Sequence, residues 1–263
     1  MKEMIRNIQV NIPFSMLREN YLKLFLEHKL NPEIGFDAAA LDAFSLRDFS
    51  PIAESLHKHE LTITAHGPFI DLSAGSTDPA VRQLTRRRFK QLLELVPLFR
   101  PKTVVCHAGY DRRRYGFFKE AWMENSLEMW SWLAARLRAE GARLMLENVY
   151  EDGPEDIRDL FEQLEDDGVG FCLDTGHMSA FGQTPLQEWL NVLGPWLKQL
   201  HLHDNDGGWD DHLALGRGRI DFQLLFNYLR DPKISPPIIT LEPHKENDFW
   251  PSLEYLQRHW DAV

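Results

Sequence analysis

Short apolar runs alternate with longer amphipathic runs along the whole chain. Short runs that end at Gly, Pro, Asn or Asp are typical of buried strands, and apolar positions at helical spacing indicate the helices between them. Eight strands are predicted at residues 5–12, 33–37, 61–65, 102–106, 143–146, 169–173, 198–203 and 238–241. Helices are predicted at residues 15–29, 46–60, 78–99, 116–140, 154–165, 184–196, 222–230 and 248–260.

The strict alternation of strands and helices predicts a parallel sheet that is covered by helices. Eight such units in 263 residues favour an α/β fold of the closed (β/α)8 TIM-barrel type, with residues 1–263 forming a single domain. The competing fold is an open doubly wound sheet. That fold would place a glycine-rich phosphate turn after the first strand, whereas the segment Asn11-Ile12-Pro13-Phe14 contains no glycine.

Composition narrows the class of protein. The formal net charge of −11 disfavours nonspecific attraction to nucleic acids or anionic membranes. The N-terminal segment lacks the apolar stretch of a signal peptide, and no apolar run reaches the roughly 18 residues of a membrane span. Cys106 and Cys172 lie within apolar strand-like runs, so we expect buried, reduced thiols in a cytoplasmic protein.

Potential metal ligands follow six successive predicted strands. Because a TIM barrel places its chemistry at the carboxyl ends of its strands, these side chains are expected to meet at one mouth. A lone histidine or glutamate at a strand end is more often a structural residue, but converging carboxylates would repel one another unless a divalent cation neutralised them. The residues are His66, His107, Glu147, Asp174, His203 and Glu242.

The segment 198–222 adds further candidate ligands. His201 and His203 share one face of the predicted strand, and we expect His201, one layer deeper, to pack in the interior. Asp210 and His212 follow in a loop rich in Asp, Gly and Asn, and carboxylate and imidazole suit zinc, manganese or iron. Arg217, between two glycines, is a candidate contact for an anionic or polyhydroxylated substrate.

Together these motifs resemble the xylose-isomerase-like TIM-barrel superfamily, which contains sugar isomerases and epimerases and also the endonuclease IV type of DNA-repair enzyme. The resemblance covers nearly the whole chain and implies a divalent metal cofactor, Mn²⁺ or Zn²⁺, with Mg²⁺ or Co²⁺ as alternatives. Its most specific parts are His66-Gly-Pro-Phe, His107-Ala-Gly, Leu146-Glu147-Asn148, Leu173-Asp174-Thr175-Gly176-His177, the run from Asp210 and His212 through Gly216 and Gly218 to Ile220-Asp221, and Leu241-Glu242.

The resemblance also implies roles for individual residues. The central metal of the isomerases and epimerases would be held by Glu147, Asp174, His203 and Glu242, and the two glutamates would also carry protons. Endonuclease-like members bind three zinc ions. The additional ligands would be His66 and His107 at one site and His177, Asp210 and His212 at another, and all nine positions are filled in this sequence.

The leading hypothesis is a metal-dependent isomerase or epimerase of a sugar, sugar phosphate or related polyhydroxy carbonyl compound. Through a metal-stabilised enediolate, one of Glu147 and Glu242 would remove a proton and the other would return it. The small carbohydrate-like substrate would be oriented by His177, His212 and Arg217. The alternative is an endonuclease IV-like hydrolase that cleaves a phosphodiester at abasic DNA, and a third hypothesis is a binding protein that has lost its activity.

Several other residues have two interpretations each. Arg112-Arg113-Arg114 is expected either to contact phosphate or to face solvent, and His244 either to touch substrate or to face solvent. Phe69 is expected to pack in the core rather than to act as a wedge in DNA. Trp122, Trp130 and Trp132 fall on one predicted helix. They are expected either to form an apolar outer patch that supports a homodimer or to lie on the core side of that helix.

Overall fold

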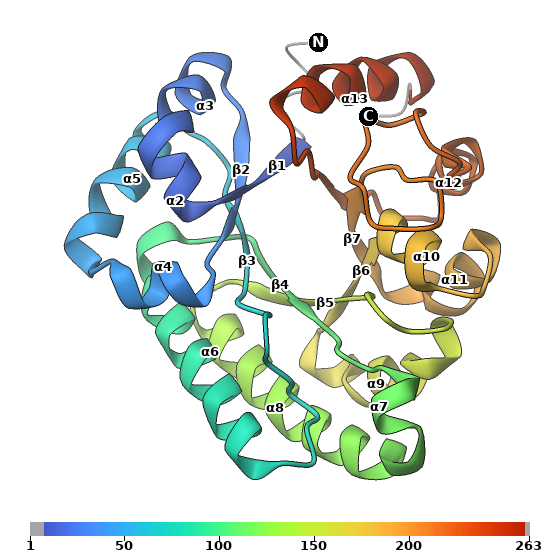
Figure 1. The fold of residues 1–263 in the computed structure, drawn as a ribbon. Coiled ribbons are helices and arrows are strands. Elements are labelled where there is room, and N and C mark those ends of the chain that lie inside the picture. The colour runs from blue at the N-terminus through green and yellow to red at the C-terminus, as the bar shows by residue number, and fades with distance from the viewer. Residues whose placement is uncertain (1–7, 261–263) are drawn as a thin grey trace.

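The computed structural model of the protein describes residues 8–260, and its strands close into a barrel in the order β1 to β8 (Figure 1). Neighbouring strands are parallel, and β1 pairs with β8 to close the barrel. The predicted (β/α)8 TIM barrel is therefore confirmed. The strands are β1 (Ile8–Pro13), β2 (Asn31–Gly35), β3 (Thr64–His66), β4 (Thr103–His107), β5 (Arg143–Glu147), β6 (Gly170–Asp174), β7 (Leu197–Leu202) and β8 (Ile238–Leu241).

Helices surround the barrel, and the long helices α6 and α8 lie side by side (Figure 1). The α-helices are α2 (Phe14–Met16), α3 (Leu22–His28), α4 (Ala38–Ala43), α5 (Leu46–Lys58), α6 (Pro79–Phe99), α7 (Arg112–Tyr115), α8 (Lys119–Ala139), α9 (Arg158–Gln163), α10 (Thr175–Phe181), α11 (Leu186–Leu193), α12 (Phe222–Leu229) and α13 (Glu246–His259). Short helical turns are η1 (Leu17–Tyr21), η2 (Gly116–Phe118), η3 (Pro154–Asp156), η4 (Glu165–Asp167) and η5 (Gly194–Trp196).

Two predicted strands are wrong in their bounds. The second runs over Asn31–Gly35 rather than 33–37, because Asn31 and Pro32 pair with β1 although an Asn-Pro dipeptide usually marks a turn. The third begins at Thr64 rather than at residue 61, and the Thr62 N–H donates instead to the Asn31 side chain (2.8 Å). Residues 5–7 of the first predicted strand lie outside the described residues.

The predicted helices are confirmed in position but not in continuity. The helix predicted over 15–29 contains the π-helical turn η1, and the helix predicted over 116–140 begins only at Lys119. The short helix α10 was not predicted. It starts directly at the end of β6, where the Asp174 carboxylate accepts the His177 N–H (2.6 Å) and thereby caps the helix.

The tryptophans of α8 face inward. Trp122 and Trp130 are buried in the core between the barrel and the helices, so the core-side interpretation holds for both. Trp132 is half-buried, and the Arg86 guanidinium lies 4.7 Å from its ring centroid. The homodimer remains a prediction.

Both cysteines are free and buried, as predicted. Burial raises the pKa of the Cys106 and Cys172 thiols, so both are expected to remain protonated and unreactive. Across residues 8–260, no helix combines the length and the apolar character that a bilayer crossing requires.

A polar layer lies inside the barrel, directly beneath its mouth. The Glu33 carboxylate is fully buried and accepts hydrogen bonds from Thr64 Oγ1 (3.0 Å), Gln199 Nε2 (2.6 Å) and Thr240 Oγ1 (3.1 Å). A buried carboxylate is costly unless it is hydrogen-bonded in this way. This layer forms a fixed floor for the residues at the carboxyl ends of the strands.

Candidate metal centre at the barrel mouth

The parallel register brings the predicted strand-end residues together. It places His107 of β4 beside Glu147 of β5, and Asp174 of β6 beside His201 of β7. Five overlapping groups of three potential ligands result, and within each group the ligand atoms lie within 4.8 Å of one another. The convergence that the sequence predicted is therefore present.

The first group consists of His66, His107 and Glu147. The Glu147 Oε2 atom lies 3.0 Å from His66 Nε2 and 3.5 Å from His107 Nε2. Burial lowers the pKa of His107 to about 3, so its ring is neutral at pH 7 and keeps a lone pair for a cation. The geometry thus offers two imidazoles and one carboxylate to a single ion.

The central group contains three carboxylates that face His201. The His201 Nδ1 atom lies 3.1 Å from Glu147 Oε1, 3.0 Å from Glu242 Oε1 and 3.9 Å from Asp174 Oδ2. Its other nitrogen, Nε2, lies 2.9 Å from Glu33 Oε1 in the layer below. His201 is one layer deeper, as predicted, but it contacts the ligand carboxylates directly and so does more than fill space.

His203 lies between the central group and an outer group. Its Nε2 atom is 3.1 Å from Asp174 Oδ1, whereas its Nδ1 atom is 3.6 Å from Asp210 Oδ1. The Asp210 Oδ2 atom in turn lies 3.1 Å from His212 Nε2 and 3.4 Å from His177 Nε2. Among the described residues, neither His203 Nδ1 nor Asp210 Oδ1 has a hydrogen-bond partner although both are buried. Such orphaned atoms fit a cation between them.

Backbone carbonyls orient three of the histidines. Gly67 O, Asn148 O and Glu242 O lie 2.9, 3.1 and 2.9 Å from the Nδ1 atoms of His66, His177 and His212 respectively. Because a carbonyl can only accept, each Nδ1 must carry the proton, and each Nε2 then presents a lone pair to the cluster. Metal-ligating histidines are held in this manner.

The electrostatics indicate that cations or protons must fill the cluster. Burial by itself would raise the pKa of Glu147, but the His201 charge and the hydrogen bond from His177 hold that pKa well below its usual value. Burial would lower the pKa of His212, but the Asp210 hydrogen bond and the Glu242 charge raise it to about 9. Without a metal, imidazolium protons therefore balance the carboxylates, and a bound cation would displace them.

A buried aspartate shapes the loop that carries the outer group. The Asp204 carboxylate accepts the backbone N–H groups of Gly216 (3.0 Å), Gly218 (2.8 Å) and Ile220 (3.2 Å). Gly216 has a φ of +77°, which favours glycine. Arg217, between these glycines, is exposed, and its guanidinium has no hydrogen bond or ion pair with the described residues. Its role in substrate binding stays a prediction.

Three buried residues were not predicted as part of the site. Glu33 and His201 form its floor, and a charged residue within a buried strand was the signal for Glu33. Glu151 accepts the backbone N–H groups of Tyr110 (3.1 Å) and Val149 (2.6 Å) and so joins the loops after β4 and β5. Burial raises the pKa of Glu151 to about 7.

The structure also places the other side chains that were expected near the mouth. The prediction that Phe69 packs in the core is wrong, because it is 41% exposed and its ring lies 4.3 Å from that of His107. His244 is exposed, and its ring stacks on His212 at 3.5 Å. Arg112 and Arg113 are exposed and pair with acidic neighbours, as expected for a solvated surface.

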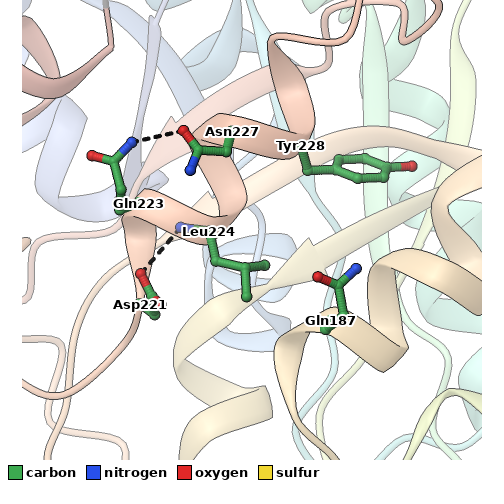
Figure 2. A pocket seen from close by; sticks show the side chains of 6 residues that line it. All are labelled: Gln187, Asp221, Gln223, Leu224, Asn227 and Tyr228. Atoms are coloured by element: carbon green, nitrogen blue, oxygen red, sulfur yellow. Dashed lines mark hydrogen bonds between the residues drawn. The ribbon is translucent and has the colours of Figure 1, made fainter.

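A separate surface pocket lies between α11 and α12 (Figure 2). Its carboxylate, Asp221, accepts the Leu224 N–H (3.1 Å) and caps α12, and Gln223 donates to Asn227 (2.9 Å). Because these polar groups already hydrogen-bond to one another, the pocket has fewer groups that could bind a ligand or react with it than the barrel mouth has. The mouth is therefore the candidate functional site.

A family model described as a xylose isomerase-like TIM barrel matches residues 32–259. The chain belongs to the xylose isomerase-like TIM-barrel family. An uncharacterised relative, MJ1311 from Methanocaldococcus jannaschii, is 26% identical over 243 residues, which cover 88% of this chain and 83% of that protein. A probable endonuclease 4 from Mycobacterium leprae is 24% identical over 185 residues, which cover 66% of this chain and 70% of that protein.

Solved structures with similar barrels share the fold of this chain. The TTHB071 protein from Thermus thermophilus, soaked with ZnCl2, has a TM-score of 0.80 at 29% identity, with 96% of this chain and 97% of that chain covered. D-Psicose 3-epimerase from Clostridium cellulolyticum, solved with D-tagatose, has a TM-score of 0.77 at 17% identity, with 97% and 100% covered. The latter likeness shows the fold alone. The family resemblance expected from the motifs is confirmed by the match of the family model.

Proposed function

We propose that this protein is a phosphodiesterase that depends on a cluster of divalent cations, with Zn²⁺ or Mn²⁺ as the expected metal. The observation that carries the proposal is the presence of ligand groups on both sides of the central carboxylates. His66 and His107 flank them on one side, and Asp210 and His212 on the other. Proton transfer at carbon needs only the central group, so the two flanking groups favour a chemistry that uses several cations.

A charge count supports this choice. The nine predicted ligands comprise five histidines and four carboxylates, so with neutral imidazoles they carry −4. One divalent cation would leave −2, which would repel an anionic substrate, whereas three would leave +2, which would attract a phosphodiester. Beneath the cluster, Glu33 and the charged His201 add one charge of each sign, so neither sum changes. The full ligand set therefore suits a phosphate ester best when it is fully loaded.

The roles of the chain's own residues follow from their contacts. When bound, the cations would supply Lewis acidity to the phosphoryl group and acidify a water molecule. Glu147 would serve both the first and the central group, because its two oxygens face opposite sets of histidines. Asp174 is held by the His177 N–H and presents its carboxylate to His203. The side chains thus orient the phosphate and fix the ligand positions.

A second candidate is the metal-dependent isomerase or epimerase of a carbohydrate-like substrate. The observation that favours it is the approach of Glu147 and Glu242 to the same His201 nitrogen, which puts two proton carriers in one site. The central group alone would serve that reaction. The two proposals therefore differ in whether cations at the two flanking groups are required for the reaction.

The deciding experiment measures bound cations and turnover together. The full chain would be loaded with Zn²⁺ or Mn²⁺, dialysed, and assayed for metal content and for hydrolysis of bis(p-nitrophenyl) phosphate. We expect about three cations per chain and metal-dependent hydrolysis, which His107→Ala lowers by about 100-fold or more because one ion loses a ligand. His57→Ala is the matched control, because it removes a histidine of α5 that belongs to none of the ligand groups and whose Nε2 lies 3.0 Å from Leu98 O. One cation per chain with no hydrolysis, together with interconversion of ketoses, would instead establish the isomerase.

A further inference from the structure

Aromatic side chains gather on the rim of the mouth beside the outer ligand group. Tyr150 follows β5, Phe181 ends α10, and Trp209 lies in the loop after β7. The Phe181 ring stacks on the His177 ring at 6.0 Å and lies 5.2 Å from Tyr150 and 6.3 Å from Trp209. Three separate segments therefore contribute one ring each to a cluster, Tyr150, Phe181 and Trp209, that we term the rim cluster.

The rim cluster remains open to solvent. Trp209 is 68% exposed and Tyr150 is 46% exposed, whereas Phe181 is half-buried between them. Trp209 directly precedes Asp210, whose carboxylate lies 3.4 Å from His177 Nε2. Grouped exposed aromatic rings beside a reactive centre are typical of a binding surface, and their flat faces favour a planar ligand.

We propose that the rim cluster stacks against the heteroaromatic base of a small, nucleotide-like phosphate ester whose phosphate is held by the ligand groups. This proposal rests on the phosphodiesterase function proposed above and names its substrate class. The Phe181 ring joins the two parts of the site, because it contacts the ligand histidine on one side and the exposed rings on the other. The base and the phosphate of one small molecule can therefore be bound at the same time.

The surrounding charges favour a small ester over a nucleic-acid polymer. Arg112 and Arg113 at the mouth are engaged by Asp152 and Asp111, so they offer little free positive charge to a phosphate backbone. The formal net charge of −11 acts in the same direction. A base within a duplex is also stacked on its neighbours and must be flipped out, whereas a mononucleotide presents the face of its base freely.

The test compares two ligands that differ only in the base. Binding of adenosine 5′-monophosphate and of ribose 5-phosphate to the Mn²⁺-loaded full chain would be measured by calorimetry. Base stacking on an aromatic side chain predicts that the nucleotide binds about tenfold or more tightly. In Trp209→Ala this ratio should fall towards one, and in Trp209→Phe it should be largely restored. Phe117→Ala, which removes a fully exposed ring that contacts no other ring among residues 8–260, should keep the wild-type ratio.

The outcomes separate this proposal from the function on which it rests. Equal affinities for the two ligands, or a ratio that Trp209→Ala leaves unchanged, would overturn the rim cluster as a base-binding site. Hydrolysis of bis(p-nitrophenyl) phosphate without a preference for the nucleotide would leave the phosphodiesterase standing and remove the base subsite. A preference for the nucleotide that depends on Trp209, without any hydrolysis, would leave the base subsite standing and remove the phosphodiesterase. Loss of both phosphate binding and hydrolysis would end both proposals.

Discussion

Replacing Gly176 by alanine tests whether the His203 ring must occupy its present position. Gly176 lies in the first turn of α10, and a Cβ built there would overlap the His203 ring, with Nε2 at 2.5 Å and two other ring atoms closer still. Ordinary contact begins at 3.4 Å, so the Nε2 atom alone would have to move by about 1 Å, and the closer ring atoms would have to move further. Only a residue without a side chain leaves room for this ligand.

The expected loss follows from that displacement. Disturbing the support of a metal ligand typically weakens metal affinity by about 10- to 100-fold, and a shift of about 1 Å in a site can lower turnover about 100-fold. Alanine is a better helix former than glycine by up to about 1 kcal/mol, which opposes any general destabilisation. We therefore expect Gly176→Ala to fold normally but to retain fewer cations and to lose phosphodiester hydrolysis.

The assay combines metal content after dialysis, calorimetric titration with Zn²⁺ and a thermal melt. Gly116→Ala is the matched control, because a Cβ there would meet only Arg112 Cγ at 3.7 Å, an ordinary contact. The reasoning is refuted if Gly176→Ala binds the same number of cations with unchanged affinity, since His203 would then be dispensable or free to move.

Three further predictions address the surroundings of the site. The folded pKa of Glu151 is about 7 and its ordinary value is 4.5, so the free energy of unfolding should fall by about 3 kcal/mol as pH rises between these values. In urea unfolding, Glu151→Gln should not show this dependence on pH. Glu33→Gln removes one partner of the buried contact with His201 and should cost about 3–5 kcal/mol in urea unfolding, whereas an unchanged midpoint would show that the contact is not an ion pair. Asp204→Ala leaves four backbone N–H groups without their acceptor, those of Asn205, Gly216, Gly218 and Ile220. The amide hydrogens of residues 205 and 216–220 should therefore exchange faster while those of the barrel strands do not; uniform exchange would contradict this.

Sequence patterns predicted the barrel and the convergence of ligands for one physical reason. In a parallel barrel all carboxyl strand ends share one rim, so Glu147 and Asp174 could be placed together without coordinates. The depth at which His201 and Glu33 lie inside the barrel could not be predicted in the same way. The contact of His201 with Glu147 depends on the β6–β7 register, which contains an irregularity between Phe171 and Cys172. Glu33 was missed because its strand begins with Asn-Pro, which resembles a turn.

Barrel strands hold the inner ligands of the site, whereas a loop holds its outer ligands. His201 links the central carboxylates to Glu33, which is itself held by four hydrogen bonds from barrel strands, so these ligands are positioned before any cation binds. Asp210 and His212 lie on a loop whose shape depends on Asp204 rather than on strand pairing. The strands therefore fix where the first cations bind, whereas the loop after β7 determines both the outer ligands and the position of Trp209. Changes in that single loop could alter the substrate of such a barrel while leaving its central metal ligands intact.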